Sequence, residues 1–188
     1  ALRRWIDEAV AEEERALRRE RASLAFGLGT SAWDGERVLD RYEILYELGL
    51  VTEAGRDRQR LEGGGGRFGP AGTEDDGRHG REMAFDHRRI LATALGRIRA
   101  KIKYRPVIFE LMPETFTLLQ LQRAVEGLAG VRLHKQNFRR LVESAGLVEP
   151  TGEVRVKTGG RPARLYRFRR EVVLERPAPG VRVNLGRS

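Results

Sequence analysis

The residues best suited to chemistry in this sequence are the cationic and amide side chains of one short segment, residues 134–145. Its apolar residues fall at i, i+3, i+4 and i+7 counted from Phe138, which predicts a helix with one buried face. The opposite face must then carry Lys135, Gln136, Arg139 and Arg140. Arginine and glutamine side chains form paired hydrogen bonds with guanine and adenine edges in the major groove. The pattern therefore predicts a helix that reads double-stranded DNA.

The neighbouring segments indicate how this helix is positioned. Thr117 and Gln120 have the spacing of a capping box, which predicts a helix start. Gly130 suits the left-handed residue that ends a helix before a sharp turn. Two short helices joined by such a turn, the second of them basic, are typical of a helix-turn-helix. Two predicted strands follow and enclose a glycine-containing basic loop at residues 158–162, which is typical of the wing of a winged helix.

The predicted DNA contacts extend from the second helix to its neighbours. A helix start can bind phosphate through its free backbone N–H groups, and an arginine on a wing can reach phosphate or enter a narrow minor groove. We expect DNA-binding residues at Thr117, His134, Lys135, Gln136, Asn137, Arg139, Arg140, Lys157, Thr158 and Arg161.

Each of these features taken alone has a plainer interpretation. Exposed arginines on a helix are usually solvated surface, and a Gly-Gly pair is a common hairpin turn. Phe138, Tyr166 and Phe168 lie on apolar faces, so we expect them in the core rather than stacked on bases. The ordered succession of the elements is what favours DNA binding.

The distribution of charge supports the same interpretation. The 188 residues carry a formal net charge of +9. Residues 1–80 hold 13 Lys and Arg against 17 Asp and Glu, whereas residues 81–170 hold 20 against 8. A basic half is the electrostatic pattern expected of a protein that binds nucleic acid.

Several classes of site are excluded by composition. The chain has no cysteine, which removes disulfides, thiolate metal sites and cysteine nucleophiles. Its three histidines, His79, His87 and His134, do not have metal-site spacing. No apolar run approaches the roughly 20 residues that span a bilayer. We therefore expect a cytoplasmic protein without catalytic residues, metal, cofactor or membrane partner.

The remaining segments suggest a helical extension in front of the DNA-binding part. Apolar periodicity predicts helices over residues 2–26, 38–49 and 86–103, whereas the glycine-rich residues 62–82 cannot bury enough surface to fold and predict a flexible linker. We expect a mainly α-helical protein with a small antiparallel β-hairpin. The predicted organisation is a helical extension over 1–61, the linker, a winged helix-turn-helix domain over 83–172 and a C-terminal tail over 173–188.

The basic half also resembles a known family in several motifs. These lie at residues 85–90 (FDHRRI), 101–106 (KIKYRP), 109–113 (FELMP), 137–140 (NFRR) and 160–166 (GRPARLY). Together they resemble the C-terminal winged helix of the Nudix-related transcriptional regulators of NAD metabolism. Residues 24–54 resemble the connector in front of that domain.

The resemblance implies an operator-binding homodimer whose Nudix domain senses ADP-ribose or a related nucleotide. A Nudix box is absent from this sequence, although Glu43 and Glu47 fit two of its glutamates. Tyr42 and Tyr46 stand where the box has arginine and glutamate. Magnesium-dependent hydrolysis needs several carboxylates on one helix face. We therefore expect an ADP-ribose effector only if a Nudix domain is present elsewhere in the natural protein.

Two alternatives to a DNA-binding regulator stay open at this point. The first is a degenerate Nudix-type protein that binds or hydrolyses nucleotides. The second is a winged helix that serves only as a protein-interaction module. The two N-terminal helices have apolar stripes that need a covering surface, which is either the dimer partner or a sensor domain.

Overall fold

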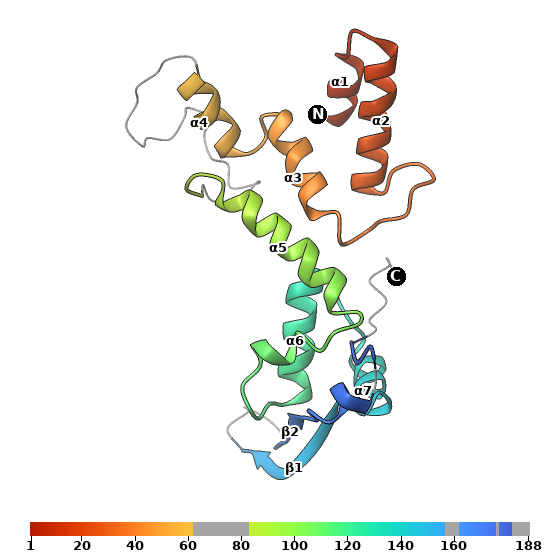
Figure 1. The fold of residues 1–188 in the computed structure, drawn as a ribbon, viewed down its shortest axis with the longest axis vertical. Coiled ribbons are helices and arrows are strands. Elements are labelled where there is room, and N and C mark those ends of the chain that lie inside the picture. Colours follow the sequence, from red (N-terminus) through yellow and green to blue (C-terminus); the bar gives the residue numbers. More distant parts are fainter. Residues whose placement is uncertain (62–82, 157–161, 176, 182–188) are drawn as a thin grey trace. The chain divides into compact units, whose positions relative to one another are not determined.

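The computed structural model describes residues 1–61, 83–156, 162–175 and 177–181. The chain forms two compact units, residues 1–96 and residues 97–185, and the division falls inside helix α5 (His87–Lys101) (Figure 1). The domain boundaries expected from the sequence place residues 83–96 with the winged helix instead.

The first unit contains four helices and the beginning of α5. They are α1 (Leu2–Asp7), α2 (Glu12–Phe26), α3 (Val38–Glu47) and α4 (Thr52–Leu61). Its small core is formed by Trp5, Ala22, Ala25 and Ile44.

Two features of this unit differ from the sequence-based prediction. The single helix predicted over residues 2–26 is wrong, because the chain leaves the helix after Asp7 and begins α2 at Glu12. The first turn of α2 holds three glutamates, which are stabilising at a helix N-terminus, so the acidic run starts a new helix. Helix α4 was not predicted, since it has a polar surface and buries only Glu53 and Ala54.

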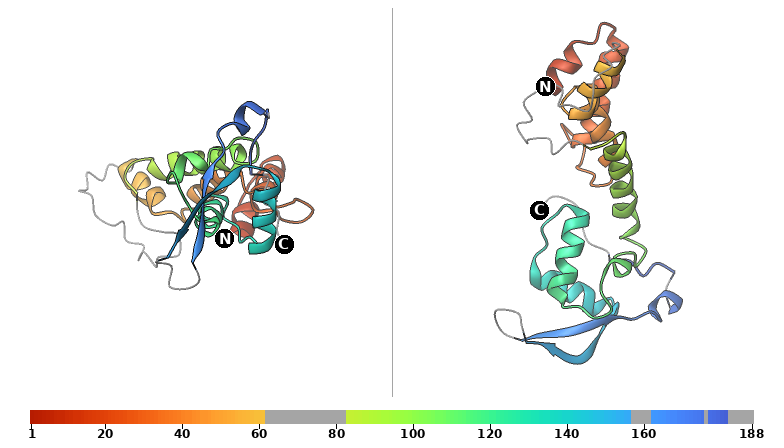
Figure 2. Two further views of the ribbon diagram at one scale, coloured as in Figure 1. Left: turned by 90° about the horizontal axis from the view of Figure 1, so that it is seen from below. Right: turned by 90° about the vertical axis from the view of Figure 1, so that its left-hand side faces the viewer.

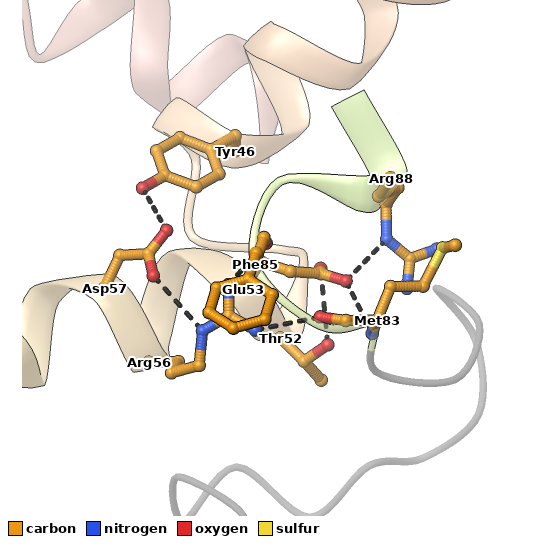
Figure 3. A network of polar contacts seen from close by, with 8 residues as sticks. All are labelled: Tyr46, Thr52, Glu53, Arg56, Asp57, Met83, Phe85 and Arg88. Carbon is orange, nitrogen blue, oxygen red and sulfur yellow. Dashed lines mark hydrogen bonds and ion pairs between the residues drawn. The ribbon is translucent and has the colours of Figure 1, made fainter. Parts of the chain in front are cut away.

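A polar network joins α4 to the start of α5 (Figure 3). The Glu53 side chain is 1% exposed, and its Oε1 accepts hydrogen bonds of 2.9 Å from the Met83 backbone N–H and from Nε of Arg88. The Arg56 guanidinium donates to the backbone carbonyls of Met83 (2.8 Å) and Phe85 (2.6 Å). Residues 83–88 are therefore held against α4, in the same unit as the helices that precede residue 62.

The second unit is a winged helix. It contains the 3-10 helix η1 (Phe109–Leu111), helices α6 (Leu118–Ala129), α7 (Lys135–Ser144) and α8 (Val172–Glu175), and strands β1 (Val148–Arg155) and β2 (Ala163–Phe168). The strands form an antiparallel hairpin beside α6 and α7 (Figure 2). This arrangement confirms the predicted fold class.

A residue just before α6, Phe116, pairs with the hairpin. Phe116 pairs with Tyr166 through two backbone hydrogen bonds of 2.9 and 2.8 Å, which gives β2 a short second neighbour besides β1. The rings of Phe109 and Phe168 stack with centroids 4.3 Å apart and join η1 to the same sheet. The hairpin, η1 and the start of α6 thus form one packed unit.

The segment after β2 also contributes to the core. Val172 and Val181 are fully buried, and the Val181 backbone N–H donates to the Ile102 carbonyl at 2.9 Å. Gly180 lies so close to the backbone of Lys103 and Tyr104 that a Cβ atom would collide with it. Gly180 and Val181 therefore pack against the end of α5, although the sequence suggested a tail from residue 173.

Within the part of the chain that the structure describes, no helix combines the length and the apolar character that crossing a bilayer requires.

The buried carboxylate of Glu53 gives a first prediction. Replacing Glu53 with alanine removes the buried carboxylate that accepts hydrogen bonds from Arg88 Nε and the Met83 N–H, so we expect a loss of about 3–5 kcal/mol in the free energy of unfolding. The matched control is Glu43→Ala. Glu43 pairs with Arg89 at 2.7 Å and also joins α5 to the helices before it, but both side chains are more than a third exposed.

The control should lose no more than about 1 kcal/mol, the usual contribution of an exposed ion pair. The measurement is urea unfolding followed by circular dichroism. Equal losses for the two variants would contradict the role assigned to Glu53.

Candidate nucleic-acid interface

Helix α7 has one buried face and one exposed cationic face. Phe138 is 3% exposed and Val142 is fully buried, so these two side chains anchor the helix in the core. All of the polar residues predicted to bind DNA lie on its surface, namely Lys135, Gln136, Asn137, Arg139 and Arg140. The structure therefore brings together the residues that the sequence assigned to one face.

The charges on this face are mostly unpaired. The side chains of Lys135, Gln136 and Arg139 form no hydrogen bond or ion pair with any other residue that the structure describes. The guanidinium of Arg140 approaches Oδ1 of Asn137 at 3.5 Å, which is the outer limit of a hydrogen bond. Cations without an internal partner remain able to pair with phosphates or base edges.

The two predicted residues at helix starts are placed differently from each other. His134 is the exposed N-cap residue of α7, and its side chain makes no capping hydrogen bond. Thr117 is 8% exposed and forms the predicted capping box, in which its hydroxyl accepts the Gln120 N–H and its backbone N–H donates to the Gln120 side chain. A phosphate at this helix start would therefore have to bind the backbone N–H groups of Leu118 and Leu119.

A polar network at the turn between α6 and α7 was not predicted from the sequence. Oε1 of Glu126 accepts hydrogen bonds from the Leu133 backbone N–H (2.7 Å) and from Nε2 of Gln122 (3.1 Å). The same Gln122 amide donates to the Leu133 carbonyl at 2.9 Å. These contacts join α6 to the last apolar residue before α7 and so fix where α7 begins.

The signal that could have revealed this network is the position of Gln122. It lies on the apolar face of α6, four residues after Leu118 and three before Val125, and it is 7% exposed. A buried amide needs hydrogen-bond partners, so its place on that face indicates a specific polar contact. The hydrogen bonds from Leu133 and Gln122 lower the pKa of Glu126 from its ordinary value.

The predicted wing is only partly described. Exposed Arg155 and Arg164 lie at the outer ends of the two strands. The residues predicted for the wing tip, Lys157, Thr158 and Arg161, lie outside the described residues.

The aromatic side chains contribute to the fold rather than to the exposed cationic surface. Phe138 belongs to the buried core, and Tyr166 and Phe168 are half-buried against it. The prediction that these three rings are core residues is confirmed.

The glutamates that fit part of a Nudix box are engaged in ion pairs. Glu43 pairs with Arg89 at 2.7 Å, and Glu47 with Arg21 at 2.5 Å. Among the described residues there is no cluster of His, Asp and Glu that could hold a metal ion.

The network at the turn gives a second prediction. Glu126→Ala removes the acceptor of the Leu133 N–H, and we expect a loss of about 1–2 kcal/mol in the free energy of unfolding, whereas Glu126→Gln keeps an acceptor and should lose about half as much. The pKa of Glu126 is lower in the folded protein than its ordinary value of 4.5. The ionised carboxylate therefore stabilises the fold above that pH, and this stabilisation is lost as the pH falls below it.

The free energy of unfolding of the wild type and of Glu126→Gln, measured at pH 7 and in the acid range, tests this direction of the pH dependence. The control is Glu143→Gln, which removes an exposed carboxylate of α7 that has no partner among the described residues. A stability difference between wild type and Glu126→Gln that stays constant with pH would contradict the assignment.

Part of this chain is similar to known proteins. Residues 108–168 match the family model of the NrtR DNA-binding winged helix domain. The "ADPR responsive transcriptional repressor NtrR" of Acinetobacter baylyi is 41% identical over 87 residues, which are 46% of this chain and 34% of that protein.

Two crystal structures of NrtR from Shewanella oneidensis are also similar. The one in complex with a 27mer DNA is 36% identical, with a TM-score of 0.43 over 50% of this chain and 42% of that chain. The other is 38% identical, with a TM-score of 0.41 over 48% of this chain and 41% of that chain. The chain spans about a third of the length of the curated relative that it matches. The resemblance drawn from the sequence motifs is confirmed, and residues 108–168 form a winged-helix DNA-binding domain of the NrtR type.

Proposed function

We propose that this chain is a sequence-specific, double-stranded DNA-binding transcriptional regulator. The observation that carries the proposal is the exposed face of α7, where Lys135, Gln136 and Arg139 have no partner among the described residues. These side chains can pair with DNA without the energetic cost of breaking an ion pair within the protein. The family match of residues 108–168 supports the same function.

In the proposed complex α7 lies in the major groove. Arg139, Arg140 and Gln136 are placed to donate to base edges, and Lys135 and His134 to contact phosphates near the helix start. Asn137 packs beside Arg140 and can orient it. The wing residues Lys157, Thr158 and Arg161 are proposed to contact the flanking backbone or groove, and the start of α6 at Thr117 a further phosphate.

We further propose that the protein binds its operator as a homodimer. Two-fold symmetric proteins of this class place two recognition helices on successive turns of DNA. The first unit exposes large apolar side chains, including Val10 at 95% and Leu17 at 55%, which need a covering surface. Either a second copy or a sensor domain can supply it.

The regulated genes and the effector are proposed from the relatives. The Acinetobacter protein is described as responsive to ADPR, and this chain spans about a third of it. We propose that the chain acts on genes of NAD metabolism in the cytoplasm, and that ADP-ribose controls it only where a Nudix domain is present. Because Glu43 and Glu47 are held in ion pairs, we propose no hydrolytic activity for α3.

Selection of bound sites from random duplexes tests specificity and symmetry together. We expect a near-palindromic consensus whose half-sites are centred about 10–11 base pairs apart, or a multiple of that spacing, because two-fold related recognition helices lie one DNA turn apart. Recovery of unrelated sequences with no consensus would contradict the proposed function.

The double variant Arg139→Ala/Arg140→Ala tests the role of α7. If both side chains contact bases, operator affinity should fall by about 1–3 kcal/mol for each residue lost. Fluorescence anisotropy at several salt concentrations is the measurement, since the wild type should also bind DNA less tightly as salt rises.

The control variant Arg3→Ala/Arg19→Ala removes the same charge from two exposed arginines of the first unit that have no partner among the described residues. It should bind the operator nearly as tightly as the wild type. Equal effects of the two double variants would mean that overall charge, and not α7, determines binding.

A further inference from the structure

Arg99 reaches from α5 to the end of α6, within the second unit. Its Nε donates a hydrogen bond of 2.8 Å to the backbone carbonyl of Leu128. Leu128 is in the last turn of α6, where carbonyl groups have no partner within the helix. A guanidinium at this position satisfies one such carbonyl and also interacts favourably with the negative end of the helix dipole.

The Arg99 side chain also fills the space beside Gly130, the C-cap residue of α6. Gly130 adopts a left-handed conformation with φ of +71°, and a Cβ atom built on it would lie 2.7 Å from Nη2 of Arg99. The guanidinium therefore packs directly on the backbone of the turn. Burial in this position lowers the pKa of Arg99.

Two contacts from different elements thus hold the turn between α6 and α7. Glu126 binds the Leu133 N–H at the start of α7, and Arg99 binds the Leu128 carbonyl at the end of α6. Only residues 130–134 lie between the two helices. Both contacts therefore act on the short segment from which α7 leaves the turn.

We propose that Arg99 is a positioning residue for DNA recognition, which fixes the angle between α6 and α7 without touching DNA. The inference rests on the proposed function. Paired hydrogen bonds to base edges need side chains in a narrow range of positions, whereas a phosphate accepts a cation from many directions. Loss of Arg99 should therefore reduce the preference for the operator more than the general affinity for DNA.

The test compares Arg99→Ala with Arg97→Ala. Arg97 lies two residues earlier on α5, is exposed and has no partner among the described residues, so its loss removes the same charge without the contact to α6. The quantity to measure is the ratio of operator affinity to affinity for an unrelated duplex, at temperatures below the unfolding of each variant.

We expect this ratio to fall about tenfold for Arg99→Ala, the change that corresponds to one charge-assisted hydrogen bond. It should stay within about twofold of the wild type for Arg97→Ala, because phosphate contacts carry no sequence information. Arg99→Lys, which keeps the charge but not the planar fork, should give an intermediate ratio. Equal ratios for Arg99→Ala and Arg97→Ala would overturn the proposal.

A substitution at Gly130 tests the same proposal if the Arg99→Ala variant does not fold. In the wild type, Gly130→Ala places a methyl group against the Arg99 guanidinium in addition to straining the backbone. The control is Gly127→Ala in the same helix, where a Cβ atom meets nothing within 4 Å. We expect Gly130→Ala to lower the ratio and Gly127→Ala to leave it unchanged.

A double-mutant cycle separates the steric collision with Arg99 from the backbone strain at Gly130. If Arg99 positions the turn, Gly130→Ala should lower the ratio less in the Arg99→Lys background, whose side chain is slimmer, than in the wild type. Strict additivity would overturn the proposal. A wild type without any operator preference would instead refute the proposed function itself.

Discussion

The burial of Phe138 and Val142 is the constraint on which the rest of the DNA-binding unit depends. A helix of ten residues is marginal in water by itself, so α7 is stable only because this face packs into the core. Because that face is buried, helix geometry places the side chains of the opposite face on the surface, namely Lys135, Gln136, Arg139 and Arg140. The cationic surface is thus a consequence of the apolar one.

Burial fixes the rotation of α7 about its axis, but it does not fix the angle of the axis. That angle depends on the turn, where polar contacts are directional in a way that apolar contacts are not. The carboxylate of Glu126 and the guanidinium of Arg99 each bind one backbone group at opposite ends of the turn. We infer a division of roles, in which apolar packing anchors α7 and the two charged side chains set its direction.

This division also explains what the sequence could and could not predict. Capping of α6 by Thr117, the left-handed Gly130 and the two faces of α7 depend on near neighbours in the chain, and all were predicted correctly. The contact of Arg99 with Leu128 spans 29 residues, and that of Glu53 with Arg88 spans 35, so no local pattern reveals them. Helix α4 was missed for the same reason, because its buried Glu53 binds Met83 and Arg88, which lie 30 and 35 residues away in the chain.

Net charge alone does not distinguish the cationic surfaces of this unit, whereas the carboxylates beside each cation do. A groove of about 1430 Å³ between η1, the base of the hairpin and α8 is lined by four Lys or Arg and four Glu residues. In that groove Arg167 is already bound to Glu149 at 2.6 Å. A phosphate in the groove would meet the four carboxylates as well as the four cations, and the repulsion from the carboxylates offsets part of the electrostatic gain. Lys135 and Arg139 on α7 instead face solvent without a partner among the described residues, so the proposed phosphate contacts there would gain the full release of counterions from DNA.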